Sequence, residues 1–295
     1  MKKSKQAYIY AALSVMFWGT IATAFKIALA ELTIVTMLGI AALVSTTVLF
    51  FIVVLSGKLH LMKVISVREI LWSALLGFIN PLAYYIILLN AYSRLPGQVA
   101  QPANMIWPIV LVFLSIPLLH QRIPARSIVS LFISLVGVYI ISSQGAPFHP
   151  GRSDTLGVMM ALFSSILWAL YFVLNVRDRR DEAVKLLTNF LFASLYLIIA
   201  MAFSGSFTEH LTLRGTAAAV YCGVFEMGIT FWFWLRALQM APTSDKISNL
   251  VFFAPFISLI FLHFIIHEPI YYTTPIGLLL IIGSILYQNR RRPAG

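Results

Sequence analysis

One acidic residue, Glu226, lies within a long apolar stretch and is the strongest candidate for chemistry in this chain. Ionisable side chains are costly inside a membrane-spanning segment, so each one is a functional candidate. A lone carboxylate there can bind a cationic group of a substrate, or carry a proton that drives transport. The alternative is that Glu226 is protonated or hydrogen-bonded, with Asn80 as its partner, and holds two helices together. We favour binding, because an uncharged residue would suffice to join helices.

Further polar and aromatic residues fall on shared helix faces, since positions three, four or seven apart lie on one side of a helix. Such faces mix rings with amides or hydroxyls, whereas surfaces that face lipid are usually aliphatic. They are therefore predicted to face inward, and the predicted substrate-binding residues are Glu226, Asn80, Tyr84, Trp18, Trp168, Tyr171, Asn104, Trp107, Asn175 and Thr230.

Aromatic rings around a single carboxylate suit an ammonium group, which a ring face attracts through cation–π interaction. The expected substrate is thus an amino acid or an amine. Lys26 either reaches to the membrane interface or attracts a substrate carboxylate. Trp232 and Trp234 lie near a helix end, and we expect them in the interfacial aromatic belt.

The elements that position these residues are predicted from hydropathy. The chain has 295 residues, of which 60% are hydrophobic and 11% charged. A soluble domain usually has about 25% charged residues, so lipid is the solvent implied. A spanning helix needs about 20 apolar residues, and ten such segments are found at 7–30, 32–55, 70–92, 98–119, 125–143, 155–176, 184–203, 214–238, 247–266 and 273–289.

The distribution of basic residues predicts the orientation. With both termini in the cytoplasm, 17 of the 21 Lys and Arg residues fall on the inner side, as the positive-inside rule requires. The four on the outer side are Lys26, Arg94, Arg152 and Arg214. An odd number of helices would destroy this asymmetry.

An internal repeat divides the chain into halves, 1–147 and 148–295. Pro96 and Pro242 lie 146 positions apart, and other residues recur at the same or a similar offset: Gly77 with Gly223, Asn80 with Glu226, Gly137 with Gly283, and Trp18 with Trp168. Five helices per half is an odd number, so the second half is inverted. We predict an all-α membrane protein of ten transmembrane helices in two inverted five-helix repeats, an arrangement typical of transporters.

Several short motifs carry a family resemblance. They are Phe17-Trp18-Gly19, Asn104-Met105-Ile106-Trp107-Pro108, Ile166-Leu167-Trp168-Ala169 and Phe253-Ala254-Pro255-Phe256, together with Gly137 and Gly283. The chain resembles the drug/metabolite transporter superfamily, in particular the EamA-type ten-helix permeases, and is similar to their aromatic amino-acid exporter branch. The resemblance implies a central cavity lined by helices 1, 3, 4, 6, 8 and 9. Many members have a Gly-Glu pair after helices 4 and 9, whereas this chain has His120-Gln121-Arg122 and His267-Glu268-Pro269.

These observations together predict a secondary transporter, an exporter of small organic metabolites, in the inner (cytoplasmic) membrane. Its partners are a small-molecule substrate, membrane lipid and a candidate coupling proton. The sequence contains no phosphate-binding loop, His-Glu-x-x-His motif or cysteine pair, so we expect no enzymatic activity, cofactor, metal or nucleic acid. A lipid-modifying membrane enzyme and a non-transporting binding subunit are the alternatives.

Overall fold

The structure, a computed structural model, is helical throughout its described residues, which are 2–107, 109–111, 113–114, 125–146, 153–240, 250 and 253–289. The predicted boundary between the halves, after residue 147, falls outside them. So do Pro108, Pro242, His120-Gln121-Arg122 and the basic residues Arg122, Arg152, Lys246 and Arg290 to Arg292. The division into two repeats stays a prediction.

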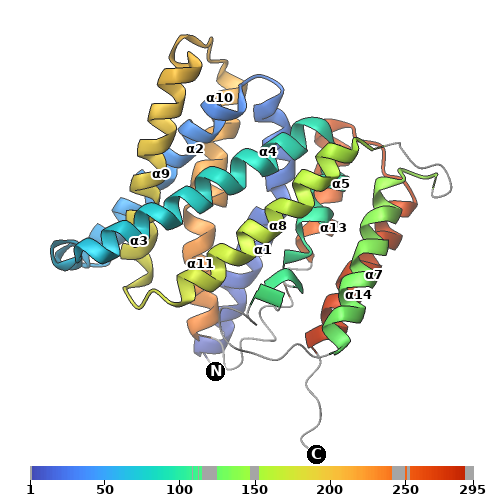
Figure 1. The fold of residues 1–295 in the computed structure, drawn as a ribbon, viewed down its shortest axis with the longest axis horizontal. Helices are drawn as coiled ribbons and strands as arrows, with labels where there is room; N and C mark the ends of the chain where they lie inside the picture. The colour runs from blue at the N-terminus through green and yellow to red at the C-terminus, as the bar shows by residue number, and fades with distance from the viewer. Residues whose placement is uncertain are drawn as a thin grey trace, which may run out of the picture.

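Most of the chain forms α-helices, of which the longest cross the molecule from end to end (Figure 1). They are α1 (Lys2–Leu29), α2 (Ile34–Leu55), α3 (Val67–Gly77), α4 (Tyr84–Arg94), α5 (Gly97–Asn104), α7 (Ala125–Ser142), α8 (Thr155–Val176), α9 (Glu182–Ser204), α10 (Leu213–Tyr221), α11 (Ile229–Met240), α13 (Ala254–Phe261) and α14 (Thr273–Asn289). Short helical segments are η1 (Leu59–Val64), η2 (Phe78–Ala83), η3 (Ser206–Thr208), η4 (Cys222–Glu226) and η6 (Leu262–Ile266).

Within the described residues, six helical stretches are long and apolar enough to span a membrane: Lys5–Leu29, Ile34–Leu55, Val67–Arg94, Thr155–Asn175, Glu182–Ser204 and Leu213–Trp234. Three shorter apolar helices are Ile128–Ser142, Ala254–Ile266 and Thr273–Tyr287. The chain is therefore a multi-pass membrane protein. The total of ten spans and the orientation of the termini stay predictions.

Two of these spans are interrupted near their middle by a π-helical turn. In the first, η2 separates α3 from α4, and Asn80 has non-helical backbone angles of φ −146° and ψ 122°. Pro81 explains this break, because a proline disfavours the helical conformation of the residue before it. In the second, η4 separates α10 from α11 and ends at Glu226. Both candidate polar residues of these spans thus lie at breaks.

The helices pack in a pattern centred on α1 and α8. α1 contacts α10, α11 and α13, while α8 contacts α4 and α5. α2 lies against α9, and α7 and α14 form a separate pair at one side of the molecule (Figure 1). We call the end where α1 begins and α8 ends the lower end, and the end where α1 ends and α2 begins the upper end, as they are drawn in Figure 1.

Small residues set the closest approach of α7 and α14. A Cβ atom added to Gly137 would lie 2.8 Å from the carbonyl oxygen of Gly277. Ser134 and Ser284 share a hydrogen bond of 2.5 Å across the same interface. Gly283, which the repeat pairs with Gly137, has no described atom within 4 Å of such a Cβ.

Candidate functional site

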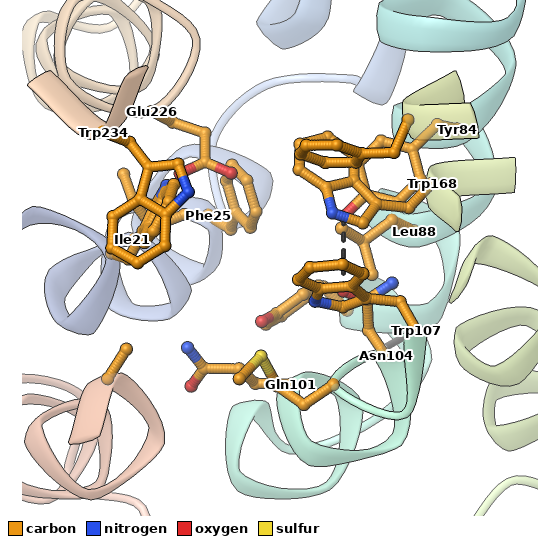
Figure 2. A pocket seen from close by; sticks show the side chains of 15 residues that line it. Ile21, Phe25, Tyr84, Leu88, Gln101, Asn104, Trp107, Trp168, Glu226 and Trp234 are labelled. Carbon is orange, nitrogen blue, oxygen red and sulfur yellow. Dashed lines mark hydrogen bonds between the residues drawn. The ribbon is translucent and has the colours of Figure 1, made fainter. Parts of the chain in front are cut away.

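A cavity of about 100 Å³ lies between α1, α4, α5, α8, η4, α11 and α13. We call it the central cavity, and it is lined by Trp18, Ile21, Phe25, Tyr84, Leu88, Tyr92, Gln101, Asn104, Met105, Trp107, Trp168, Phe172, Glu226, Trp234 and Ala254. Figure 2 shows Glu226 and Trp234 on one side of it, with Tyr84, Trp168 and Trp107 on the other. Six of the ten predicted site residues line it: Trp18, Tyr84, Asn104, Trp107, Trp168 and Glu226.

Among the described residues that line this cavity, Glu226 is the only one with a carboxylate, and it is 8% exposed. The hydroxyl of Tyr85 donates a hydrogen bond of 2.9 Å to its Oε1 atom. Its buried Oε2 atom has no hydrogen-bond partner among the described residues. A buried polar atom without a partner is costly, so this oxygen is available to accept a hydrogen bond from a ligand.

Tyr85 was not among the predicted site residues, and the break at η2 explains why. The prediction placed Asn80 and Tyr84 on one face, on the assumption of a continuous α-helix. Because Asn80 is non-helical, this rule does not hold across the break. Asn80 is buried, and its Oδ1 atom has no hydrogen-bond partner among the described residues. Tyr85, and not the expected Asn80, forms the hydrogen bond with Glu226.

Aromatic rings form most of the cavity wall. The ring centroids of Trp168 and Tyr84 lie 4.7 Å apart, and those of Trp107 and Phe172 are stacked at 5.4 Å. Such distances are typical of favourable ring pairs. The rings of Trp18 and Trp234 lie 5.1 Å apart. Trp234, expected in the interfacial belt, therefore belongs to the cavity.

Asn104 supplies an amide to the same wall. Its Nδ2 donates to Ser164 Oγ at 2.8 Å, and its Oδ1 accepts from the hydroxyl of Tyr84 at 3.3 Å. These two bonds join α5 to α8 and α4, and they fix which way the amide points. Gln101, one turn earlier on α5, also lines the cavity.

A second cavity, of about 350 Å³, lies towards the lower end. Tyr171 and Asn175, both predicted site residues, line it. Trp18, Phe172 and Trp234 line both cavities and form an aromatic partition between them.

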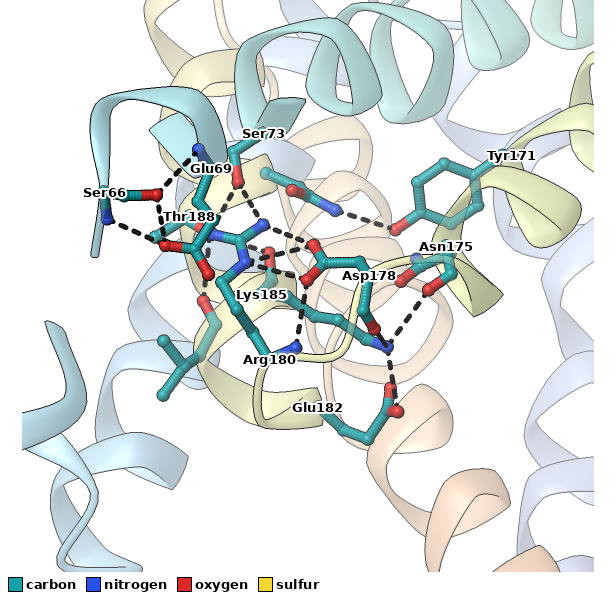
Figure 3. Close-up of polar contacts among 12 residues, drawn as sticks. Ser66, Glu69, Ser73, Tyr171, Asn175, Asp178, Arg180, Glu182, Lys185 and Thr188 are labelled. Atoms are coloured by element: carbon teal, nitrogen blue, oxygen red, sulfur yellow. Dashed lines mark hydrogen bonds and ion pairs between the residues drawn. The ribbon is translucent and has the colours of Figure 1, made fainter. Parts of the chain in front are cut away.

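The rim of this second cavity is charged, and it includes Asp178, Glu182 and Lys185 (Figure 3). Lys185 Nζ bonds to Glu182 Oε1 at 2.8 Å and to the carbonyl oxygens of Asn175 and Asp178, each at 3.3 Å. These bonds join the end of α8 to the start of α9.

The remaining two predicted residues line neither cavity. Thr230 is fully buried, and its hydroxyl donates to the carbonyl oxygen of Phe225, where it supports the break at η4. Asn80 is 1% exposed, within η2. The structure thus brings together eight of the ten predicted residues in two adjoining cavities.

At the upper end, a cluster of polar contacts joins the start of α5 to the segment before α14 and to the first turn of α14. Glu268 accepts hydrogen bonds from the backbone N–H groups of Gly97 at 2.8 Å and Gln98 at 3.3 Å. Gln98 donates to the carbonyl oxygen of Pro269 at 2.6 Å and accepts from Thr274 at 2.7 Å. We call these contacts the upper closure.

Lys26 reinforces the same end of the molecule. Its Nζ donates to the carbonyl oxygens of Tyr92 and Leu95 at 2.9 and 2.7 Å, at the C-terminus of α4. A cation is favoured at that end of a helix. These contacts give Lys26 a structural role at the end of α4, which neither of the two roles expected for it described.

No cluster of three or more His, Cys, Asp or Glu side chains suitable for a metal occurs in the part of the chain that the structure describes. The single cysteine, Cys222, is buried within η4. What the central cavity offers chemically is one carboxylate, two amides and a set of ring faces.

Known proteins resemble the chain over most or all of its length. An uncharacterized transporter, YvbV, from Bacillus subtilis (strain 168) is 25% identical, and the match covers 100% of this chain and 94% of that protein. An uncharacterized transporter from Archaeoglobus fulgidus is 24% identical, over 97% of this chain and 99% of its own. Protein PecM from Dickeya dadantii (strain 3937) is 22% identical over 72% of this chain and 71% of its own.

A solved structure of similar fold and a matching family model agree with the similarity to these relatives. A crystal structure of a protein that is 17% identical superposes with a TM-score of 0.67 and covers 97% of each chain. The EamA-like transporter family matches residues 5–143 and again residues 155–289. The expected superfamily is thereby confirmed, and the names point to transport rather than to catalysis. The chain is a membrane transporter that belongs to the EamA-like transporter family.

Proposed function

We propose that this transporter exports small organic metabolites that carry an ammonium group, such as amines or amino acids, through the central cavity. The observation that carries the proposal is Glu226, a buried carboxylate with one unpaired oxygen in an aromatic cavity. An ammonium group would supply both the missing hydrogen bond and the opposite charge. The surrounding rings add cation–π attraction, which strengthens when the cation is desolvated.

Alternating access is the mechanism that the packing supports. In this proposal, the upper closure seals one end of the central cavity. The second cavity extends from the aromatic partition to charged residues at the lower end. With the predicted topology, the lower end faces the cytoplasm, so this is a cytoplasm-facing arrangement. Export then requires the upper closure to open and the aromatic partition to close.

The pattern of contacts also supports two exchanging halves. α1 packs on α11 and α13, and α8 packs in the corresponding way on α4 and α5. Exchange of the predicted halves maps the first set of contacts onto the second. In this proposal, the two sets of helix contacts loosen and tighten in turn. The coupling ion is a proton, which Glu226 binds in the absence of substrate. The proposed location is the inner membrane, with both termini in the cytoplasm.

The test is transport by purified protein in proteoliposomes without ATP. Loaded vesicles should exchange a labelled compound from a panel of amino acids, aromatic amines and choline, and Glu226→Gln should abolish this exchange. Glu209→Gln, which neutralises a carboxylate in the loop before α10, is the matched control and should transport normally. The proposal fails if no compound of the panel is exchanged or raises the thermal stability of the protein. Normal transport by Glu226→Gln would leave Glu226 as a structural residue.

A further inference from the structure

A groove of about 570 Å³ lies at the lower end, on the opposite side of Asp178 from the second cavity. It runs between the start of α3 and the segment that follows α8, and its lining includes Arg68, Arg177 and Arg179. The transport proposal uses none of these residues. These three arginines outnumber the two acidic residues of the lining, Glu69 and Asp178, so an anion is the expected ligand.

Two of these arginines lack a counterion. Among the described residues, Arg68 and Arg179 have no hydrogen-bonded or ion-paired partner. The acidic residues of the groove are already engaged. Glu69 accepts hydrogen bonds from the backbone N–H and the hydroxyl of Ser66, at 2.8 and 2.6 Å.

Asp178 is bound to Arg180, which does not line the groove. Arg180 Nε donates to Asp178 Oδ1 at 3.0 Å and Arg180 Nη2 donates to Oδ2 at 2.5 Å, with both side chains buried (Figure 3). The same guanidinium donates to Ser73 at 2.7 Å and to Thr188 at 3.2 Å. These bonds fasten the segment after α8 to both α3 and α9, so the groove is held in shape before any ligand arrives.

The surface of α3 identifies the kind of anion. Trp72 lines the groove one turn from Arg68, and tryptophan is enriched where a membrane protein meets the lipid headgroups. From the groove towards the middle of the molecule, the exposed residues are Val67, Leu71 and Leu75 of α3 and Phe78 at the start of η2. Their spacing of three or four residues forms one apolar stripe along the helix. An acyl chain would lie along this stripe when the headgroup occupies the groove.

We propose that this groove binds the phosphate of an anionic phospholipid, with Arg68 and Arg179 as its main contacts and Trp72 at the level of the headgroup. A zwitterionic lipid carries its own cation, which the arginines would repel. Free phosphate would lack the contact with the apolar stripe, and so would bind more weakly.

The test compares three probes on the purified full-length protein: dioctanoyl phosphatidylglycerol, dioctanoyl phosphatidylcholine and inorganic phosphate. Native mass spectrometry counts bound lipid, and thermal unfolding measures protection. Phosphatidylglycerol should bind and protect, whereas the other two should not at the same concentration. In the double variant Arg68→Gln/Arg179→Gln the apparent affinity should fall by about thirtyfold, since each surface arginine contributes about a factor of five.

The control is the double variant Arg94→Gln/Arg214→Gln, which removes the same charge from the upper end and should bind phosphatidylglycerol as the wild type does. Equal loss in both double variants would show a general charge effect and overturn the proposal. Equal protection by inorganic phosphate would replace the lipid site with a free-anion site. If the double variant does not fold, competition on the wild type decides, because equal binding of the two lipids contradicts the proposal.

Discussion

The upper closure makes a quantitative prediction about the substitution Glu268→Gln. The carboxylate of Glu268 accepts two backbone hydrogen bonds at the N-terminus of α5. Hydrogen bonds to a charged acceptor contribute about 1.5–3 kcal/mol, against about 1 kcal/mol for a neutral one. The charge itself is favoured at a helix N-terminus by up to about 1 kcal/mol. Glutamine retains one acceptor oxygen, so the closure should weaken by about 1–2 kcal/mol, which corresponds to a shift of about 5- to 30-fold towards the upper-open state.

Thiol accessibility measures that shift. Cys222→Ser removes the single native thiol, which is buried in η4, and Gln101→Cys places a new one in the lining of the central cavity. A membrane-impermeant maleimide is applied to intact cells, to which the upper end is exposed in the predicted orientation. Adding Glu268→Gln should raise the labelling rate about 5- to 30-fold, within the range of the calculated shift.

The matched control is Glu209→Gln. Glu209 also accepts a hydrogen bond from a backbone N–H at a helix start, that of Thr33 at 2.7 Å, but it joins α2 to the loop before α10 rather than closing the cavity. Its substitution should leave the labelling rate unchanged. An unchanged rate in Glu268→Gln, or an equal rise in both variants, would refute the role given to the upper closure.

Two further predictions concern stability. Asp178→Asn should lower the free energy of unfolding by about 3 kcal/mol, because it leaves the buried Arg180 guanidinium without its counterion. Thermal unfolding measures this loss, with Asp154→Asn as the control, because the side chain of its partner Arg94 is 41% exposed. Burial raises the pKa of Asp178, but the hydrogen bonds and charge of Arg180 outweigh this and hold the pKa below its usual value. In the wild type, the Asp178–Arg180 pair should therefore contribute to the free energy of unfolding above about pH 4, and this contribution should be lost as the pH falls further. The free energy of unfolding of Asp178→Asn should fall less on acidification. Gly137→Ala should destabilise the protein by about 1–3 kcal/mol, because its new methyl group would lie 2.8 Å from the carbonyl oxygen of Gly277. Gly283→Ala is the control and should not destabilise the protein, because the space around Gly283 is open. Equal melting temperatures for the two variants would contradict this packing.

The extents of several helices could be predicted closely from hydropathy and local signals. The segment 273–289 coincides with α14, and 184–203 differs from α9 by two residues at its start and one at its end. α9 begins after Asp181, whose side chain caps it, and ends at Gly205 with a φ of 71°. Such capping residues are visible in a sequence because their chemistry is local.

The candidate site is harder to predict, because the rule that places residues on a shared helix face assumes an unbroken helix. Pro81 marks the break at η2, but η4 contains no proline, and the sequence Cys222–Glu226 has no comparable signal. Tyr85 was missed for this reason. The upper closure was missed for another, since Glu268 and Gly97 are separated by 171 residues and no pattern along the chain pairs them.

The aromatic partition has a consequence for ion leakage. Trp18, Phe172 and Trp234 offer ring faces and two indole N–H groups, with no oxygen atom to replace the hydration shell of a metal ion. A small inorganic cation would lose its water there and gain little. A quaternary ammonium ion is more weakly hydrated, and it can exchange water for ring faces. A partition of this composition would therefore favour the passage of such an organic cation, the proposed kind of cargo, over sodium and potassium. Transport of it need not dissipate the ion gradients of the cell.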